Sequence, residues 1–145
     1  MNKTVRIPSK LYHDLYTRGG DKLVAIYCII KSSRNGEDKY AIYKSKNNKV
    51  VAGYNLIKAK TVLSLSSIQK FVPILIEMGV CSIDFNGNFI VLGGEKLKQK
   101  YNCKKLVPIS IGKNLKETME NSFIVRLHSN FTQQEKKINK KKYLS

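Results

Sequence analysis

The dipeptide Asn86-Gly87 constrains the fold of this 145-residue chain more than any other feature of its sequence. It lies between two alternating runs, VCSIDF and NFIVLG. Asn-Gly favours a two-residue turn with positive φ angles, which joins two antiparallel strands. Pairing around such a turn places Ile83 opposite Ile90 on one face. The sequence therefore predicts a β-hairpin over residues 80–92.

The residues before the hairpin carry the pattern of an amphipathic helix. Ser66 and Gln69 form an S-x-x-Q capping box, in which each side chain satisfies a backbone N–H at the helix start. Pro73 removes one helical hydrogen bond, so we expect a kink there, and Gly79 supplies a left-handed end. Apolar residues recur on one face at helical spacing: Ile68, Val72, Leu75 and Ile76, flanked by Phe71 and Met78.

Caps and glycines divide the first part of the chain. Residues 4–7 (TVRI) alternate and predict a short edge strand that Pro8 ends. Ser9 offers the N-cap of a short helix, which Gly19-Gly20 ends. Asp21 offers the cap of a second, broadly apolar helix that continues to residue 34.

A further short helix is expected between residue 53 or 54 and residue 62. It places Leu56 and Ile57 inward, and it places Lys58 and Lys60 outward. A tight Leu-Ser turn then leads into the helix that begins near Ser66.

Helix, turn, helix and hairpin thus follow one another over LIKAKTVLSLSSIQKFVPILIEMGVCSIDFNGNFIVLGG. With residues 21–34 as first helix, this order resembles the winged helix-turn-helix family, especially small regulators and replication-associated proteins of bacteria and their phages. The resemblance implies an α+β fold that binds double-stranded DNA. It also implies the residues that line the recognition helix: Ser66, Ser67, Gln69, Lys70 and Pro73. The hairpin tip departs from the family because it lacks the Arg or Lys that wings often carry.

The positive charge of the chain favours polyanionic partners. Lys and Arg number 27 against 10 Asp and Glu, a formal net charge of +17. Such a field attracts nucleic acid first and anionic membranes second, although a lysine-rich composition is also typical of an AT-rich coding sequence. We expect phosphate contacts from lysines before and within the recognition helix and in the tail: Lys58, Lys60, Lys70, Lys136, Lys137, Lys140 and Lys141.

The last third of the chain predicts a long amphipathic helix. Asn114 and Glu117 form a second capping box at its start. Apolar residues follow at every fourth position or near heptad spacing: Leu115, Met119, Phe123, Ile124, Leu127, Phe131 and Ile138. Two interpretations remain open. The helix packs on its own domain, or residues 115–138 pair with a second copy to form a homodimer that reads two half-sites.

We therefore expect an α+β chain with two parts. Residues 1–93 form a winged helix-turn-helix domain, and residues 94–145 form a basic connector and a C-terminal helix. The function predicted is sequence-dependent binding of double-stranded DNA by a transcriptional regulator or replication-associated factor. An alternative is a structural or adaptor protein, such as a phage component, which uses the same fold for protein contacts.

Catalytic and metal-binding signatures are absent from the sequence. It contains no P-loop, HExxH or GxSxG motif. Cys28, Cys81 and Cys103 stand far apart, which predicts free thiols in a reducing compartment. No run reaches about 18 apolar residues, and no apolar secretory signal opens the chain. We expect a cytoplasmic protein of a bacterial cell or phage-infected host, with no enzymatic activity, no metal and no cofactor.

Overall fold

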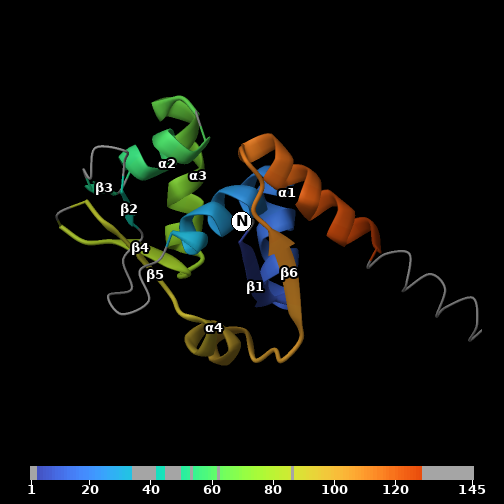
Figure 1. Ribbon diagram of the computed structural model, residues 1–145. Coiled ribbons are helices and arrows are strands. Elements are labelled where there is room, and N and C mark those ends of the chain that lie inside the picture. Colours follow the sequence, from blue (N-terminus) through green and yellow to red (C-terminus); the bar gives the residue numbers. More distant parts are fainter. Residues whose placement is uncertain are drawn as a thin grey trace, which may run out of the picture.

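The chain has an α+β fold in which one long helix lies between two groups of elements (Figure 1). This computed structural model describes residues 3–33, 42–44, 50–52, 54–61, 63–85 and 87–128. The elements in chain order are β1 (Thr4–Pro8), α1 (Ser9–Ser32), β2 (Ile42–Lys44), β3 (Val50–Ala52), α2 (Tyr54–Thr61), α3 (Leu65–Glu77), β4 (Cys81–Ile83), β5 (Phe89–Val91), α4 (Gly94–Tyr101), β6 (Leu106–Ser110) and a helix over residues 115–128. The described strands pair antiparallel as β1 with β6, β2 with β3 and β4 with β5. The predicted α+β class is confirmed.

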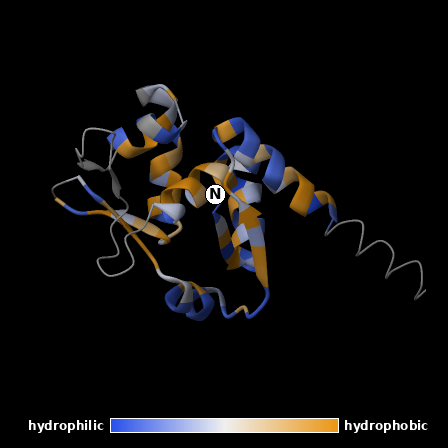
Figure 2. Ribbon diagram, viewed as in Figure 1, coloured by the Kyte–Doolittle hydropathy of each residue, from blue (hydrophilic) through white to orange (hydrophobic). Residues whose placement is uncertain are grey.

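Helix α1 is the centre of the core and changes direction at Gly20. This residue has φ 68° and ψ −164°, so α1 consists of two helical halves. In the second half, every residue from Leu23 to Ile30 is buried. A helix that is apolar on all sides belongs inside a protein, and Figure 2 shows hydrophobic residues concentrated on the inner helices. The break predicted at Gly19-Gly20 is confirmed.

The start of α1 differs from the prediction. Pro8 occupies the N-cap without a side-chain cap bond, and Ser9 is already the first helical residue. The prediction of Ser9 as cap is wrong because β1 runs directly into the helix. The Ser9 hydroxyl instead lies 3.3 Å from the Sγ of Cys103.

Helices α2 and α3 pack against α1 and against each other. Leu56 and Ile57 of α2 are buried, as predicted. The N-cap of α3 is Ser64, whose side chain accepts a hydrogen bond from the Ser67 backbone N–H at 3.3 Å. Ser66 lies in the first turn, so the predicted capping box of Ser66 and Gln69 is wrong. A serine two residues earlier in the same Leu-Ser run performs the capping.

The buried face of α3 follows most of the predicted stripe. Ile68, Val72 and Leu75 are at most 1% exposed, but Ile76 is 39% exposed. Phe71 and Met78 are buried in its place. The helix continues through Pro73 to Glu77, and Gly79 follows with φ 75°. The predicted left-handed glycine is therefore confirmed.

The hairpin of β4 and β5 is confirmed, but its register is not the predicted one. Ile83 pairs with Phe89 rather than with Ile90, a shift of one residue. Gly87, with φ 84°, donates its N–H to the Asp84 carbonyl at 3.0 Å, which gives a longer loop than a two-residue turn. Because side chains alternate along a strand, the shift turns Phe89 inward, and Phe89 is fully buried. Asn86 itself lies outside the described residues.

The segment after the hairpin returns to the first strand. A helix, α4, forms where a connector was expected, and its Leu97 is fully buried. Strand β6 then pairs with β1 along its whole length, from Thr4 opposite Ser110 to Pro8 opposite Leu106. This pairing joins residues on both sides of the boundary predicted at residue 93 into one sheet and one core.

The helix over residues 115–128 starts as predicted, because Asn114 Oδ1 accepts the Glu117 backbone N–H at 2.9 Å. Its inward side is mixed: Thr118 and Ser122 are fully buried, and Leu115, Met119 and Val125 pack against the core. Three apolar side chains of the predicted stripe face solvent instead: Phe123, Ile124 and Leu127. Residues 129–145, including the tail lysines Lys136, Lys137, Lys140 and Lys141, lie outside the described residues.

Two general expectations can be compared with the structure. Cys28, Cys81 and Cys103 are free, as predicted. Within the described part of the chain, no helix combines the length and apolarity that a membrane span requires.

Candidate nucleic-acid interface

The predicted recognition residues lie together on the outward side of α3. Ser66, Gln69, Lys70 and Pro73 are exposed, and Ser67 is partly exposed. They are held in place because the opposite side of the helix packs into the core through Ile68, Val72, Phe71 and Leu75. The arrangement is a polar helix face on a rigid apolar support.

A cluster of hydroxyl groups forms the start of α3. Ser64 Oγ lies 3.1 Å from the hydroxyls of both Ser66 and Ser67. The first turn contains no acidic residue. Backbone N–H groups and the positive end of the helix dipole therefore meet hydroxyl donors here, which suits contact with an anion. Ser64 was missed as a member of this group because the turn was predicted to end two residues later.

Two lysines from different helices flank the Phe71 ring. The Nζ atoms of Lys70 and Lys22 lie 5.9 Å and 5.3 Å from the ring centroid. Cation–π contacts at these distances hold the two amines beside the outward side of α3. Lys22 could not be found from sequence, because it belongs to α1 and no local pattern links it to Phe71.

Pro73 adds a backbone acceptor to the same face. Proline has no N–H, so it cannot donate to the carbonyl of Gln69, four residues earlier. Both residues are exposed. The face therefore offers a carbonyl acceptor beside the Gln69 amide.

The two lysines of α2 differ in their exposure to solvent. Lys58 is exposed, whereas Lys60 is partly buried. Burial lowers the pKa of Lys60, and the positive charge of Lys3 lowers it further.

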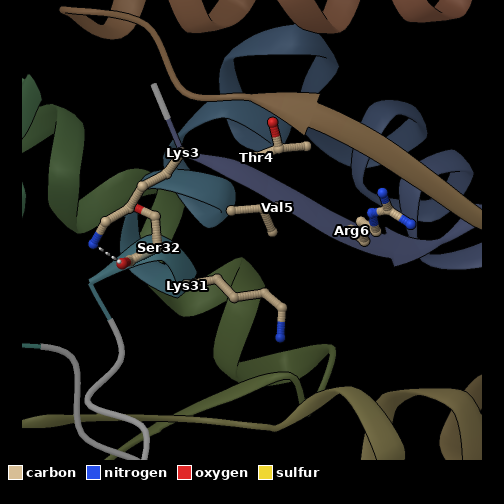
Figure 3. Close-up of a pocket in the computed structure, with 6 residues that line it drawn as sticks. All are labelled: Lys3, Thr4, Val5, Arg6, Lys31 and Ser32. Carbon is tan, nitrogen blue, oxygen red and sulfur yellow. Dashed lines mark hydrogen bonds between the residues drawn. The ribbon is translucent and has the colours of Figure 1, made fainter. Parts of the chain in front are cut away.

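Near Lys3 a groove of about 380 Å³ runs along β1. It is lined by Lys3, Thr4, Val5 and Arg6 of β1 and by Lys31 and Ser32 at the end of α1 (Figure 3). None of these six residues is acidic. The groove was not predicted, because its two sides are more than 20 residues apart in sequence.

The hairpin tip carries one fully exposed aromatic side chain. Phe85 is 99% exposed, whereas the neighbouring Asp84 accepts the Asn88 backbone N–H at 3.0 Å through its carboxylate. No Lys or Arg lies between β4 and β5. The tip therefore offers no cation for a phosphate.

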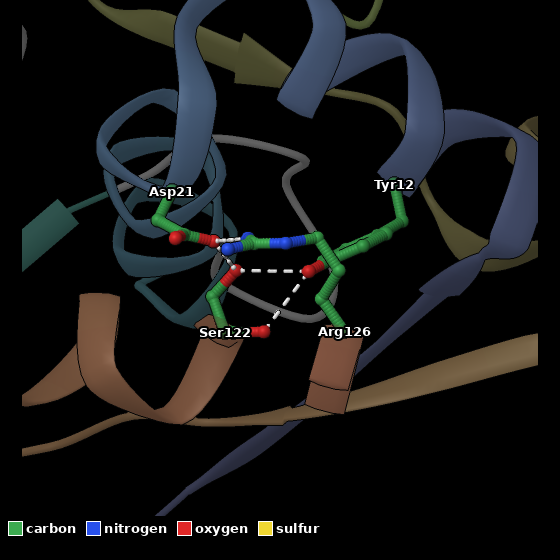
Figure 4. A network of polar contacts seen from close by, with 4 residues as sticks. All are labelled: Tyr12, Asp21, Ser122 and Arg126. Carbon is green, nitrogen blue, oxygen red and sulfur yellow. Dashed lines mark hydrogen bonds and ion pairs between the residues drawn. The ribbon is translucent and has the colours of Figure 1, made fainter. Parts of the chain in front are cut away.

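A second polar cluster lies where the C-terminal helix crosses α1 (Figure 4). Asp21 accepts the Ser122 hydroxyl at 2.8 Å and forms an ion pair with Arg126. Tyr12 donates its hydroxyl to the Ser122 carbonyl at 2.9 Å. Ser122 is fully buried, so a substrate cannot reach its hydroxyl. This network fastens the C-terminal helix to the core.

No group of three or more His, Cys, Asp or Glu side chains suited to a metal ion occurs in the described ranges. Comparison of the chain with protein-family models, with curated proteins and with solved structures finds no match.

Proposed function

We propose that this chain binds double-stranded DNA through the outward face of α3, as a cytoplasmic transcriptional regulator or replication-associated factor. In this proposal α2 and α3 are the helix-turn-helix, and the hairpin of β4 and β5 is the wing of a winged helix. The major groove of B-DNA admits an α-helix, and α3 is the helix that enters it.

The observation that carries the proposal is an exposed, acid-free N-terminal half on a helix whose other face is buried. Ser66, Gln69 and Lys70 project from this half. Gln pairs with adenine through two hydrogen bonds, and Lys contacts guanine or a phosphate. The face can therefore read bases and hold the backbone at once.

Phosphate contacts in this proposal come from the lysines around α3. Lys22 and Lys70 flank Phe71, and Lys58 is exposed on the preceding helix. Phosphate contacts release counterions, so affinity falls steeply as salt rises. The wing contributes little, because its tip carries no cation.

The first test measures duplex binding and its salt dependence. Selection of bound fragments from a random duplex pool gives the preferred sequence, and fluorescence anisotropy gives the affinity between about 50 and 200 mM salt. We expect a preferred sequence and a steep fall in affinity. Absent or salt-independent binding would refute the proposal.

Two single substitutions then separate base reading from phosphate contact. Gln69→Ala should cost about 1–3 kcal/mol for the preferred base and relax preference at that position. Lys70→Ala should weaken binding to all sequences alike. Gln99→Ala and Lys96→Ala on α4 are matched controls, because both side chains are exposed on a different helix. If the α3 and α4 variants lost the same affinity for DNA, α3 would not be the recognition helix.

Exposed apolar side chains favour a second candidate, a structural or adaptor protein that binds protein. Phe123, Ile124 and Leu127 are 48%, 54% and 57% exposed on the C-terminal helix. They also fit the expected homodimer through residues 115–138. Sedimentation in high salt without nucleic acid distinguishes the candidates: a persistent oligomer with no duplex binding supports the adaptor.

A further inference from the structure

The exposed face of α3 has a middle line and two sides, which follow from helical geometry. Ser66 and Pro73 are exposed and lie seven residues apart, about two turns, so both belong to the middle line. Gln69 and Lys70 are adjacent in sequence and diverge by about 100° around the helix. They are exposed on opposite sides of the line. A hydroxyl and an apolar ring are thus flanked by one amide and one amine.

The amine of Lys70 is directed away from the middle line by an aromatic ring. Lys70 Nζ lies 5.9 Å from the centroid of the Phe71 ring, and Lys22 Nζ lies 5.3 Å from the same centroid. Because Lys22 belongs to α1, the shared ring holds the Lys70 amine on the α1 side of α3. An amine at this edge suits the phosphate backbone, and the base edges are left to the middle line and to Gln69.

The residue types on the rest of the face fit one kind of base pair. Arg or Lys reads guanine, and a carboxylate reads cytosine. Residues 65–76 contain no Arg, Asp or Glu, and their one Lys is Lys70. Gln69 carries the amide that pairs with adenine, and Pro73 carries the apolar carbon that suits the 5-methyl group of thymine. The free carbonyl of Gln69 accepts from the amine of adenine or cytosine alike, so it does not distinguish the two pairs.

The position of Pro73 inside α3 points to a contact outside the chain. Proline is the least favourable residue in the interior of a helix. The Pro73 ring is exposed and is not part of the apolar core. Packing within the chain therefore does not offset the cost of this residue, whereas a contact of the ring with a ligand does.

We propose that α3 reads A·T base pairs, with Gln69 on an adenine and the Pro73 ring on the 5-methyl group of a thymine. This inference rests on the proposed function, because α3 is taken as the helix in the major groove. Gln69 and Pro73 are four residues apart, which is about 6 Å along the helix axis. Successive bases of one strand are about 3.4 Å apart. The adenine and the methyl group therefore lie within about two base-pair steps of each other.

The first test compares short duplexes of alternating A·T, alternating A·U and alternating G·C. Uracil is thymine without the 5-methyl group, so the A·U duplex removes only the methyl contact. By fluorescence anisotropy at low salt, the wild type should bind A·T about fourfold more tightly than A·U, the factor for one methyl group taken out of water. It should bind G·C more weakly than A·T by on the order of tenfold. Equal affinity for A·T and A·U would overturn the role of Pro73.

Pro73→Gly and Pro73→Ala then separate the ring from the backbone. Both restore an N–H at this position, and both residues are better helix formers than proline, so α3 stays folded. Pro73→Gly should bind A·T and A·U equally, and Pro73→Ala should be intermediate because it keeps one apolar carbon. Pro108→Ala, at an exposed proline of β6, is the control and should keep the preference of the wild type. A loss that is equal for A·T and A·U in both Pro73 variants would assign the contact to the Gln69 carbonyl and overturn that of the ring.

Gln69→Ala tests the adenine contact with the same three duplexes. This variant should lose the preference for A·T over G·C and keep the preference for A·T over A·U. Lys70→Ala should weaken binding to all three duplexes alike, because its amine contacts phosphate. If Gln69→Ala also weakened all three alike, Gln69 would not read adenine.

Two further outcomes separate DNA binding itself from the reading of A·T. If the wild type bound none of the three duplexes at low salt, the proposed function would fail. If it bound all three equally, with an affinity that falls steeply as salt rises, DNA binding would stand and the reading of A·T would fail.

Discussion

The outward face of α3 and the network of Asp21, Ser122 and Arg126 are both polar clusters. They differ in how far apart in sequence the hydrogen-bonded residues of each cluster are. Ser64 contacts hydroxyls two and three residues away, all of them near solvent. Asp21 bonds to residues 101 and 105 positions away, and the side chains of this ion pair are only 17% and 18% exposed. Polar groups with near, exposed partners can exchange them for a ligand. Polar groups with distant, buried partners hold the fold together.

The largest expected effect is on stability, from a substitution in the buried network of Asp21, Ser122 and Arg126. Asp21→Ala removes the acceptor of Ser122 and leaves the Arg126 guanidinium largely buried without its carboxylate. We expect the free energy of unfolding to fall by about 3 kcal/mol, measured by urea denaturation. Duplex affinity per folded molecule should stay unchanged, because α3 is not part of the network.

Asp14→Ala is the matched control for Asp21→Ala. Asp14 pairs with Arg18 at 3.0 Å, but these side chains are 35% and 39% exposed. Exposed i,i+4 pairs contribute about 0.5 kcal/mol or less. Equal losses in the two variants would break the distinction between a network that holds the fold and a surface pair.

A smaller effect is expected from Tyr12→Phe, which removes the contacts of the Tyr12 hydroxyl with the carbonyl and hydroxyl of Ser122 in the same network. The loss should be about 1 kcal/mol near neutral pH, because buried polar atoms of Ser122 lose the Tyr12 hydroxyl as a partner. Burial raises the pKa of Tyr12 above its ordinary value of 10.0, although its hydrogen bonds to Ser122 and Arg126 oppose this.

The raised pKa of Tyr12 gives this prediction a pH signature. Above pH 10.0 the unfolded tyrosine releases its proton first, so the wild type loses stability as the pH rises toward the folded pKa. The Phe variant has no such group. The stability difference between the two proteins should therefore shrink above pH 10.0, and a constant difference would contradict burial of the hydroxyl.

At the exposed start of α3, helix capping should make the loss of Ser64 more destabilising than the loss of Ser66. Ser64→Ala should lower the free energy of unfolding by about 1 kcal/mol, because it removes the acceptor for the Ser67 N–H. Ser66→Ala should cost less than about 0.5 kcal/mol but should weaken duplex binding. If Ser66→Ala lowered the free energy of unfolding more than Ser64→Ala, Ser66 would be the cap, as first predicted.

The smallest effect is expected at the hairpin tip. Phe85 is almost fully exposed, so Phe85→Ala should change the free energy of unfolding by less than about 0.5 kcal/mol. Duplex affinity should also stay within the error of an anisotropy titration. A marked loss of affinity would show that the wing contacts DNA and would require a larger interface than α3 provides.

Most features set by near neighbours were predicted, although the caps expected at Ser9 and Ser66 were wrong. The break at Gly20, the cap at Asn114, the glycine after α3 and the stripe of Ile68, Val72 and Leu75 all depend on residues within a few turns. The hairpin was found for the same reason. Its register was wrong because Asn-Gly permits more than one loop length, and the burial of Phe89 selects between them.

Features set by distant neighbours were missed. Helix α4 has a mostly polar sequence, and a single buried leucine, Leu97, anchors it to the core. Lys22 joins Lys70 only because α1 and α3 pack side by side. Only the first part of the apolar stripe of the C-terminal helix packs on the core, through Leu115 and Met119. The buried partners of its next turns are polar, because Ser122 bonds to Tyr12 and Asp21 of α1.

The sequence by itself determined that this chain forms helices, a hairpin and an α3 with one polar face, because propensity and periodicity act over short distances. Only the tertiary structure decided the strand register, the pairing of β1 with β6 and the groove between β1 and the end of α1. These depend on which apolar groups find room in one shared core, and many local patterns are compatible with more than one such packing.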